Sequence, residues 1–194
     1  KTLVKKIVKK LDKYSERVLL SLIPSSVVKR GEFESSVSDN DWYIRSVKSF
    51  LRSDYRFKNF KRSQIYREVL EHVTLDQAKK YLDQIEKNNP KFLTETILGR
   101  VSVNDLVGNP PTFDFGRYGR LSGPTIRYLK VCADLDEFFD IKKIGEIAEI
   151  GGGYGGQALV FDQLFYYQKY TIFDLALVCD LINKYLGNYF LQGG

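Results

Sequence analysis

The spacing of apolar residues predicts that the first half of the chain is helical. In several stretches of this half, most clearly residues 2–23, apolar side chains recur every three or four positions, as they do on one face of a helix. Pro24 ends the first of these patterns, and Thr74 with Gln77 three residues later is a typical start for the fourth. We therefore expect helices over residues 2–23, 41–51, 63–73, 75–88 and 92–98, the last of them ending at Gly99.

The second half alternates between helical and strand patterns. Thr125–Asp140 has a broad apolar face that predicts a strong helix. After it the sequence predicts a strand over 144–150, a glycine turn, a helix over 157–167, a strand over 169–173 and a helix over 175–186. We expect Gly187 to end that last helix and Tyr189 to begin a third strand.

Residues 100–124 fit neither pattern, because glycine and proline interrupt them repeatedly. We therefore divide the chain into a helical domain (1–99), a linker or substrate loop (100–124) and an α/β domain (125–194). Arg117, Tyr118 and Arg120 stand between glycines and are candidates for contacting sugar hydroxyls or phosphates. The alternative is a plain linker whose aromatic residues pack against both sides.

A second basic and aromatic stretch spans residues 52–62. Interleaved residues of these types can stack on bases or grip phosphates. We favour the simpler interpretation of a loop, in which the aromatic side chains anchor the segment to the core and the charged ones lie in water.

Charge and composition exclude several classes of protein. The net charge is +6, but the excess of lysine is concentrated in the N-terminal segment, whereas residues 145–194 are acidic overall. This distribution argues against a nucleic-acid partner for the whole chain. The single histidine argues against a His-rich metal site, and Cys132 and Cys179 lie in apolar patterns typical of buried thiols in a reducing compartment. With no apolar run near the ~20 residues of a membrane span, we expect a cytoplasmic protein.

The stretch 147–156 is where the chemistry of the chain is concentrated. A buried strand leads directly into Gly151-Gly-Gly-Tyr-Gly-Gly156, and a helical pattern follows. Strand, glycine turn and helix form the nucleoside-binding half of a doubly wound α/β unit. Asp174 ends the next strand, at the place where a carboxylate can accept hydrogen bonds from a ribose diol.

These residues resemble a known family. The pattern Glu149-x-Gly151-x-Gly153-x-Gly155 is similar to the first motif of class I S-adenosylmethionine-dependent methyltransferases. The stretch 172–178 resembles their second motif, with Ala176 where proline is usual. Upstream, 121–131 is similar to the segment before the glycine motif in bacterial sugar O-methyltransferases. The likeness covers roughly residues 105 to 186.

The resemblance implies a Rossmann-like class I methyltransferase domain after an N-terminal helical region. It implies that Gly151 to Gly155, including Gly152 and Tyr154, border S-adenosyl-L-methionine. Glu149 steadies this loop or meets the methionine ammonium, and Asp174 holds the ribose. The substrate would be a hydroxyl of a sugar or glycan precursor, and no residue can be assigned as the catalytic base.

Two other functions remain open. Gly151, Gly153 and Gly156 also satisfy the G-x-G-x-x-G fingerprint of an NAD-dependent oxidoreductase or epimerase. The other alternative is a non-catalytic interaction module, because the sequence supplies fewer strands than a methyltransferase sheet needs. We accordingly expect a fragment of a longer protein that associates with a second copy or another partner. Its basic N-terminal helix would contact an anionic membrane, although we favour a packed helix with solvated lysines.

Overall fold

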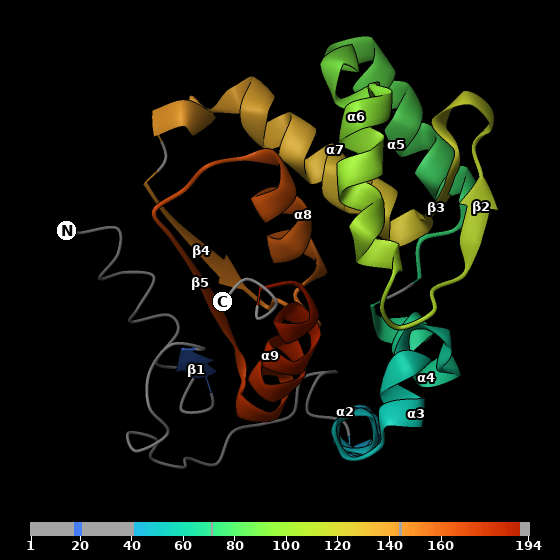
Figure 1. The fold of residues 1–194 in the computed structure, drawn as a ribbon, viewed down its shortest axis with the longest axis vertical. Helices are drawn as coiled ribbons and strands as arrows, with labels where there is room; N and C mark the ends of the chain where they lie inside the picture. The colour runs from blue at the N-terminus through green and yellow to red at the C-terminus, as the bar shows by residue number, and fades with distance from the viewer. Residues whose placement is uncertain (1–17, 21–40, 71, 144, 191–194) are drawn as a thin grey trace.

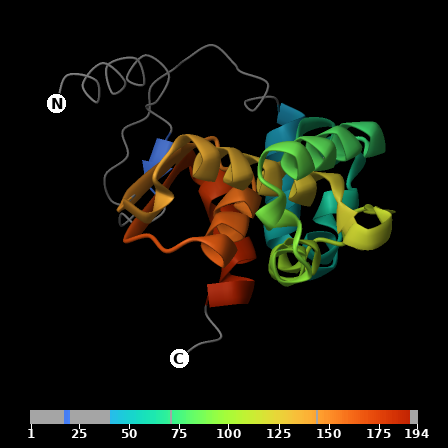
Figure 2. The same ribbon diagram turned by 90° about the horizontal axis from the view of Figure 1, so that it is seen from above.

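The computed structural model describes residues 18–20, 41–70, 72–143 and 145–190, and within them the chain is a mixture of helices and strands. Figure 1 shows two groups of elements, with strands β4 and β5 on one side and a set of helices on the other. The same separation is seen from above in Figure 2. No helix among the described residues is long and apolar enough to cross a membrane.

The helical group begins with α2 (Asp41–Arg52), which confirms the helix predicted over 41–51. Its buried side chains, Tyr43, Val47 and Phe50, follow the spacing of one helical face. The predicted helix over 63–73 is shorter than expected, and the residues before it are helical rather than a loop. The elements here are α3 (Asp54–Lys58), the 3-10 helix η2 (Phe60–Arg62) and α4 (Gln64–Val69).

Helix α5 (Leu75–Asn88) confirms both its predicted range and its predicted start. Thr74 accepts a hydrogen bond from the backbone N–H of Gln77, and the Gln77 side chain accepts one from the N–H of Thr74. This capping box satisfies two of the N–H groups that a helix start leaves free.

The segment after α5 is more continuous than the sequence predicted. A 3-10 turn η3 (Pro90–Leu93) leads into α6 (Glu95–Val101) and a second 3-10 turn η4 (Ser102–Asp105). The helix does not end at Gly99 as expected. The following residues, expected to be irregular, contain a small antiparallel hairpin of β2 (Thr112–Asp114) and β3 (Arg120–Ser122), connected by η5 (Gly116–Tyr118).

Helix α7 (Gly123–Phe138) connects the two groups, because it packs against α5 on one side and α8 (Gly156–Leu164) on the other. After the short turn η6 (Ile141–Lys143) come β4 (Glu146–Ile150), α8 and β5 (Lys169–Leu175). Strands β4 and β5 are parallel, which confirms the predicted order of strand, glycine turn, helix and strand. One hydrophobic core contains side chains from both groups. The division of the chain into separate domains stays a prediction.

Three predictions for the ends of the chain were wrong. Residues 18–20, expected in a helix, form strand β1 (Val18–Leu20), which pairs antiparallel with β5. The rest of the predicted helix over 2–23 lies outside the described residues. Helix α9 (Ala176–Phe190) continues through Gly187, so that Tyr189 is helical and not the start of a strand. The Tyr189 hydroxyl donates to the carbonyl of Val103, which favours the longer helix.

A buried lysine holds the two groups together. Lys61, from η2, is 0% exposed, and its ammonium lies 4.3 Å from the ring centre of Tyr154 in the glycine turn and 4.9 Å from that of Tyr185 in α9. The ammonium also donates to the backbone carbonyl of Asn104 at 2.5 Å. A buried charge is costly unless it is satisfied in this way. The prediction that the charged side chains of residues 52–62 lie in water is therefore wrong for Lys61.

The Asn104 side chain is the centre of the surrounding hydrogen bonds. Its amide nitrogen donates to the hydroxyls of Thr125 and Tyr154, and its amide oxygen accepts from Tyr185. The site is buried, so water cannot replace these partners. Loss of one side chain therefore leaves several buried polar groups poorly satisfied.

We predict that Asn104→Ala lowers the free energy of unfolding by roughly 2–4 kcal/mol, the range for a broken buried network. Urea denaturation measures the change. Asn183→Ala, at an exposed position of α9, is the matched control and should cost less than about 0.5 kcal/mol. Similar losses in both variants would show that the Asn104 network does not stabilise the fold.

Candidate functional site

The glycine turn after β4 has a backbone shape that requires glycine. Gly151, Gly153 and Gly155 have φ angles of +79°, +60° and +92°, in the left-handed region that other residues rarely adopt. The Gly151 N–H donates to the carbonyl of Phe173, which extends the pairing of the two strands, and the Gly155 N–H donates to the carbonyl of Gly152. The turn therefore holds a fixed shape between β4 and the start of α8.

The missing side chains of these glycines face different surroundings. A Cβ on Gly152 would lie 2.4 Å from the side chain of Ile172, so this glycine allows the turn to pack on β5. A Cβ on Gly153 would meet Leu70 at 3.3 Å, and one on Gly155 would meet Ile182 and Leu186 at 3.2 Å. Only open space surrounds the Cβ position of Gly151. Among the predicted glycines, Gly151 is the one whose side-chain direction leaves room for a ligand.

Asp174, at the carboxyl end of β5, is hydrogen-bonded to the turn. One oxygen accepts from the Gly153 N–H at 3.0 Å, and the other accepts from the Leu175 N–H at 2.7 Å. Burial raises the pKa of this carboxyl, and the bonds from the backbone partly oppose that rise. The Gly152 N–H also hydrogen-bonds this carboxyl. A carboxylate has about four acceptor positions, so capacity remains for a ligand hydroxyl.

Glu149, near the end of β4, is paired with a tyrosine from the neighbouring strand. The Tyr170 hydroxyl donates to its carboxylate at 3.0 Å. Burial raises the pKa of Glu149 to about 7; the bond from Tyr170 lowers it, and the charge of Asp174 adds to the rise. The structure therefore brings the two predicted acids close enough to influence each other.

Two helices from the helical group approach this edge of the sheet. The pKa of the Tyr43 phenol, from α2, is raised by burial and further by the charge of Asp174. Leu70, which follows α4, lies beside Gly153. The helical group therefore supplies part of the surroundings of the turn.

Tyr154, which the resemblance implies as a border of the ligand, has a buried side chain. Its side chain is 1% exposed and packs edge-on against Tyr185, with 4.9 Å between ring centres. Only its backbone can border a ligand, whereas its ring anchors the turn to the core. The sequence did not distinguish a ligand contact made by the Tyr154 backbone from a core contact made by its ring.

The structure does not bring Arg117, Tyr118 and Arg120 to the glycine turn. They lie in the β2–β3 hairpin, which both ribbon views show on the far side of the helical group from β4. Arg117 forms an ion pair with Glu86 and a hydrogen bond with Tyr118. Arg120 lies within 3.4 Å of the carbonyl of Thr112. Arg117 thus already has partners, and the three residues are separate from the predicted cofactor site.

Three residues near the site were missed from the sequence: Tyr170, Tyr43 and Leu70. Tyr170 had a usable signal, because strand pairing places it beside Ile147, two residues before Glu149. The other two had none, since their positions depend on how α2 and α4 pack against a distant part of the chain.

The arrangement favours a ligand that carries positive charge. Two partly buried carboxyl groups lie at the same turn, and a nearby cation would stabilise their charged forms. A nearby anion would destabilise the charged forms of both carboxyl groups. The open space at Gly151 and the acceptor at Asp174 add room and a hydrogen-bonding partner for a nucleoside.

Comparisons with models of protein families, with curated proteins and with solved structures found no match for this chain.

We predict that the stability of the protein falls as the pH rises from about 4.5 to about 7. In this range Glu149 is ionised in the unfolded chain and still protonated in the folded one, so the unfolded state binds fewer protons. The difference in pKa corresponds to roughly 3 kcal/mol. Urea denaturation at several pH values measures it.

Glu149→Gln keeps an acceptor for Tyr170 but cannot ionise, so it should remove most of this pH dependence. Glu146→Gln, at the exposed start of the same strand, is the matched control. The same fall in stability in the wild type and in Glu149→Gln would contradict the assignment.

Proposed function

We propose that the chain binds S-adenosyl-L-methionine at the glycine turn and belongs to an O-methyltransferase that acts on a sugar hydroxyl. One observation carries the proposal: Asp174 at the end of β5 is hydrogen-bonded to the glycine turn that follows β4. The turn and the acceptor for a ribose are thereby held at one edge of a parallel strand pair, as in Rossmann-like nucleoside sites. The choice of a sugar rests on the sequence resemblance.

The residues at the turn fit this ligand. Open space at Gly151 allows a nucleoside to approach the backbone. Asp174 has acceptor capacity for a ribose hydroxyl beyond its bonds to Leu175 and to the backbone of the turn. Glu149, held by Tyr170, is the second acid and would attract the positive groups of the ligand.

The charge at the turn favours this ligand over NAD, which satisfies the same glycine pattern. S-adenosyl-L-methionine carries two positive groups, a sulfonium and an ammonium, against one carboxylate, whereas NAD would bring an anionic pyrophosphate next to Glu149 and Asp174. Like charges within a few ångströms disfavour each other, particularly where burial reduces screening.

When bound, S-adenosyl-L-methionine supplies an electrophilic methyl group for an oxygen nucleophile. The contribution of this chain would be to hold the ribose through Asp174, to shape the backbone through the turn and to limit water through Tyr43 and Leu70. Positioning of this kind accounts for a large part of catalysis between two bound reactants. We assign no residue as the general base.

Calorimetric titration tests the proposal. S-adenosylhomocysteine should bind and NAD should bind at least tenfold more weakly. Asp174→Asn should weaken binding of S-adenosylhomocysteine at least tenfold, because one acceptor is replaced by a donor. The control is Asp180→Asn, an exposed change on α9 that should alter affinity less than twofold. Preferred binding of NAD, or an unchanged affinity in Asp174→Asn, would reject this assignment.

A methyl group added at Gly151 provides an independent prediction. Gly151→Ala should lower the affinity for S-adenosylhomocysteine at least tenfold, because its Cβ would occupy the open space at the turn. Gly116→Ala is the control, since Gly116 also has a positive φ of +62° and open space around its Cβ position. Both variants should lose about 1–2 kcal/mol of stability from backbone strain, but only Gly151→Ala should lose binding. Equal affinities in the two would place the ligand elsewhere.

A further inference from the structure

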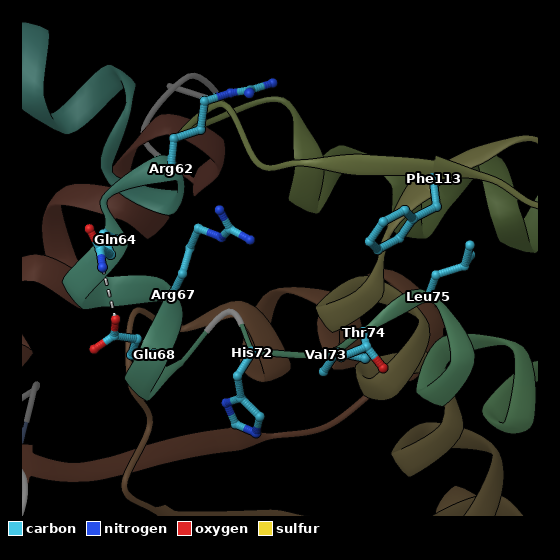
Figure 3. A pocket seen from close by; sticks show the side chains of 9 residues that line it. All are labelled: Arg62, Gln64, Arg67, Glu68, His72, Val73, Thr74, Leu75 and Phe113. Carbon is cyan, nitrogen blue, oxygen red and sulfur yellow. Dashed lines mark hydrogen bonds between the residues drawn. The ribbon is translucent and has the colours of Figure 1, made fainter.

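A cleft of about 660 Å³ lies on the helical group, between the α4 region and the β2–β3 hairpin. Its volume is within the usual range for small-molecule sites. Figure 3 shows Arg67 extending from α4 into the space that Phe113 of β2 faces from the opposite wall. The sequence predictions did not bring these residues together. The complete lining consists of Arg62, Gln64, Arg67, Glu68, His72, Val73, Thr74, Leu75 and Phe113.

The charges in this cleft favour an anion. Arg62 and Arg67 are both exposed, and neither forms an ion pair with another residue of the described ranges. The acid in the lining, Glu68, accepts a hydrogen bond from the Gln64 side chain at 3.3 Å, one helical turn away. Two guanidinium groups on separate elements can each hold a phosphate through paired N–H donors.

The opposite wall is apolar. Phe113 is half-buried, and Val73 and Leu75 lie beside the cleft on the segment that leads into α5. An aromatic face of this kind stacks on planar rings, with a gain of about 1–3 kcal/mol for a base. The lining of one cleft therefore combines two groups that can bind phosphate with an aromatic face that can stack on a planar ring.

We propose that this cleft binds a nucleoside diphosphate, with the phosphates on Arg62 and Arg67 and the base on Phe113. The binding itself requires no assumption about the rest of the chain. If the proposed methyltransferase function is correct, the bound nucleotide would be the nucleotide part of a nucleotide-linked sugar substrate. Leu70 lies beside Gly153 and His72 lines the cleft, so the same short segment separates the two sites.

Uridine diphosphate, pyrophosphate and uridine are suitable probes, titrated calorimetrically at constant salt. Uridine diphosphate should bind at least tenfold more tightly than either of the others. Arg67→Gln should lower the affinities for uridine diphosphate and pyrophosphate at least tenfold. Phe113→Ala should lower the affinity for uridine diphosphate at least fivefold. It should lower the affinity for pyrophosphate less than twofold, since pyrophosphate has no ring to stack.

Arg52→Gln is the matched control, because Arg52 lines a different basic cleft with Arg45, Lys48 and Arg56. It removes the same charge and should change the affinity for uridine diphosphate less than twofold. Equal losses in Arg52→Gln and Arg67→Gln would show general attraction to a basic surface and overturn the proposal. So would an affinity for uridine diphosphate no greater than that for pyrophosphate, or an absence of uridine diphosphate binding.

Titration of S-adenosylhomocysteine into the same variants separates this proposal from the proposed function. Arg67→Gln and Phe113→Ala should retain its affinity within twofold, because neither residue lies at the glycine turn. Binding of uridine diphosphate without binding of S-adenosylhomocysteine would support the proposed nucleotide site and reject the proposed methyltransferase function. Binding of S-adenosylhomocysteine alone would reject the cleft.

Discussion

The contact of Lys61 with Tyr154 and Tyr185 is the interaction on which the rest of the structure depends. An ammonium without water must be satisfied by protein groups, and here aromatic faces and the carbonyl of Asn104 do so. These groups come from η4, the glycine turn and α9, which are far apart in the sequence. Because the lysine is stabilised only when all of them are in place, the position of the turn is coupled to the packing of the helical group.

A second constraint operates at the turn itself, where Glu149 and Asp174 are kept partly out of water. Their raised pKa values show that burial disfavours the charged forms of both acids. A fold selected only for stability would place apolar or solvated groups here. The cost is understandable if a ligand with positive charge compensates the acids when it binds, since unfavourable electrostatics in the free protein then increase the preference for that ligand.

How much could be predicted depended on whether the relevant interactions are local. The start of α5 was predictable because Thr74 and Gln77 satisfy each other within one turn, and the glycine turn was predictable because positive φ angles require glycine. The burial of Lys61 was not, since residues 52–62 have the composition of a solvated basic loop. Its satisfaction comes from Asn104 and Tyr185, whose proximity is a property of the complete fold.

The residues of the candidate site also divide into those that local patterns could predict and those that tertiary contacts placed. The glycines and Asp174 could be predicted to lie together because a βαβ arrangement fixes where the ends of its strands lie, whereas Glu149 was singled out by the resemblance. Arg117, Tyr118 and Arg120 were candidates for substrate contacts because they stand between glycines, and the hairpin places all three away from the glycine turn. Gly187 was expected to end a helix on local propensity, but a contact between Tyr189 and Val103 extends that helix instead. Tertiary contacts of this strength routinely override the preference of a single glycine.

The short segment between α4 and α5 gives the two proposed sites a common wall. On one side Leu70 lies beside Gly153; on the other, His72 and Val73 line the basic cleft. The capping box at Thr74 fixes the end of this segment, and the Lys61 contact fixes the element that precedes α4. A ligand that displaced Leu70 would therefore have to move a segment held at both ends. This is the arrangement expected if the segment keeps two ligands at a fixed separation, because transfer between bound groups depends on holding that separation constant.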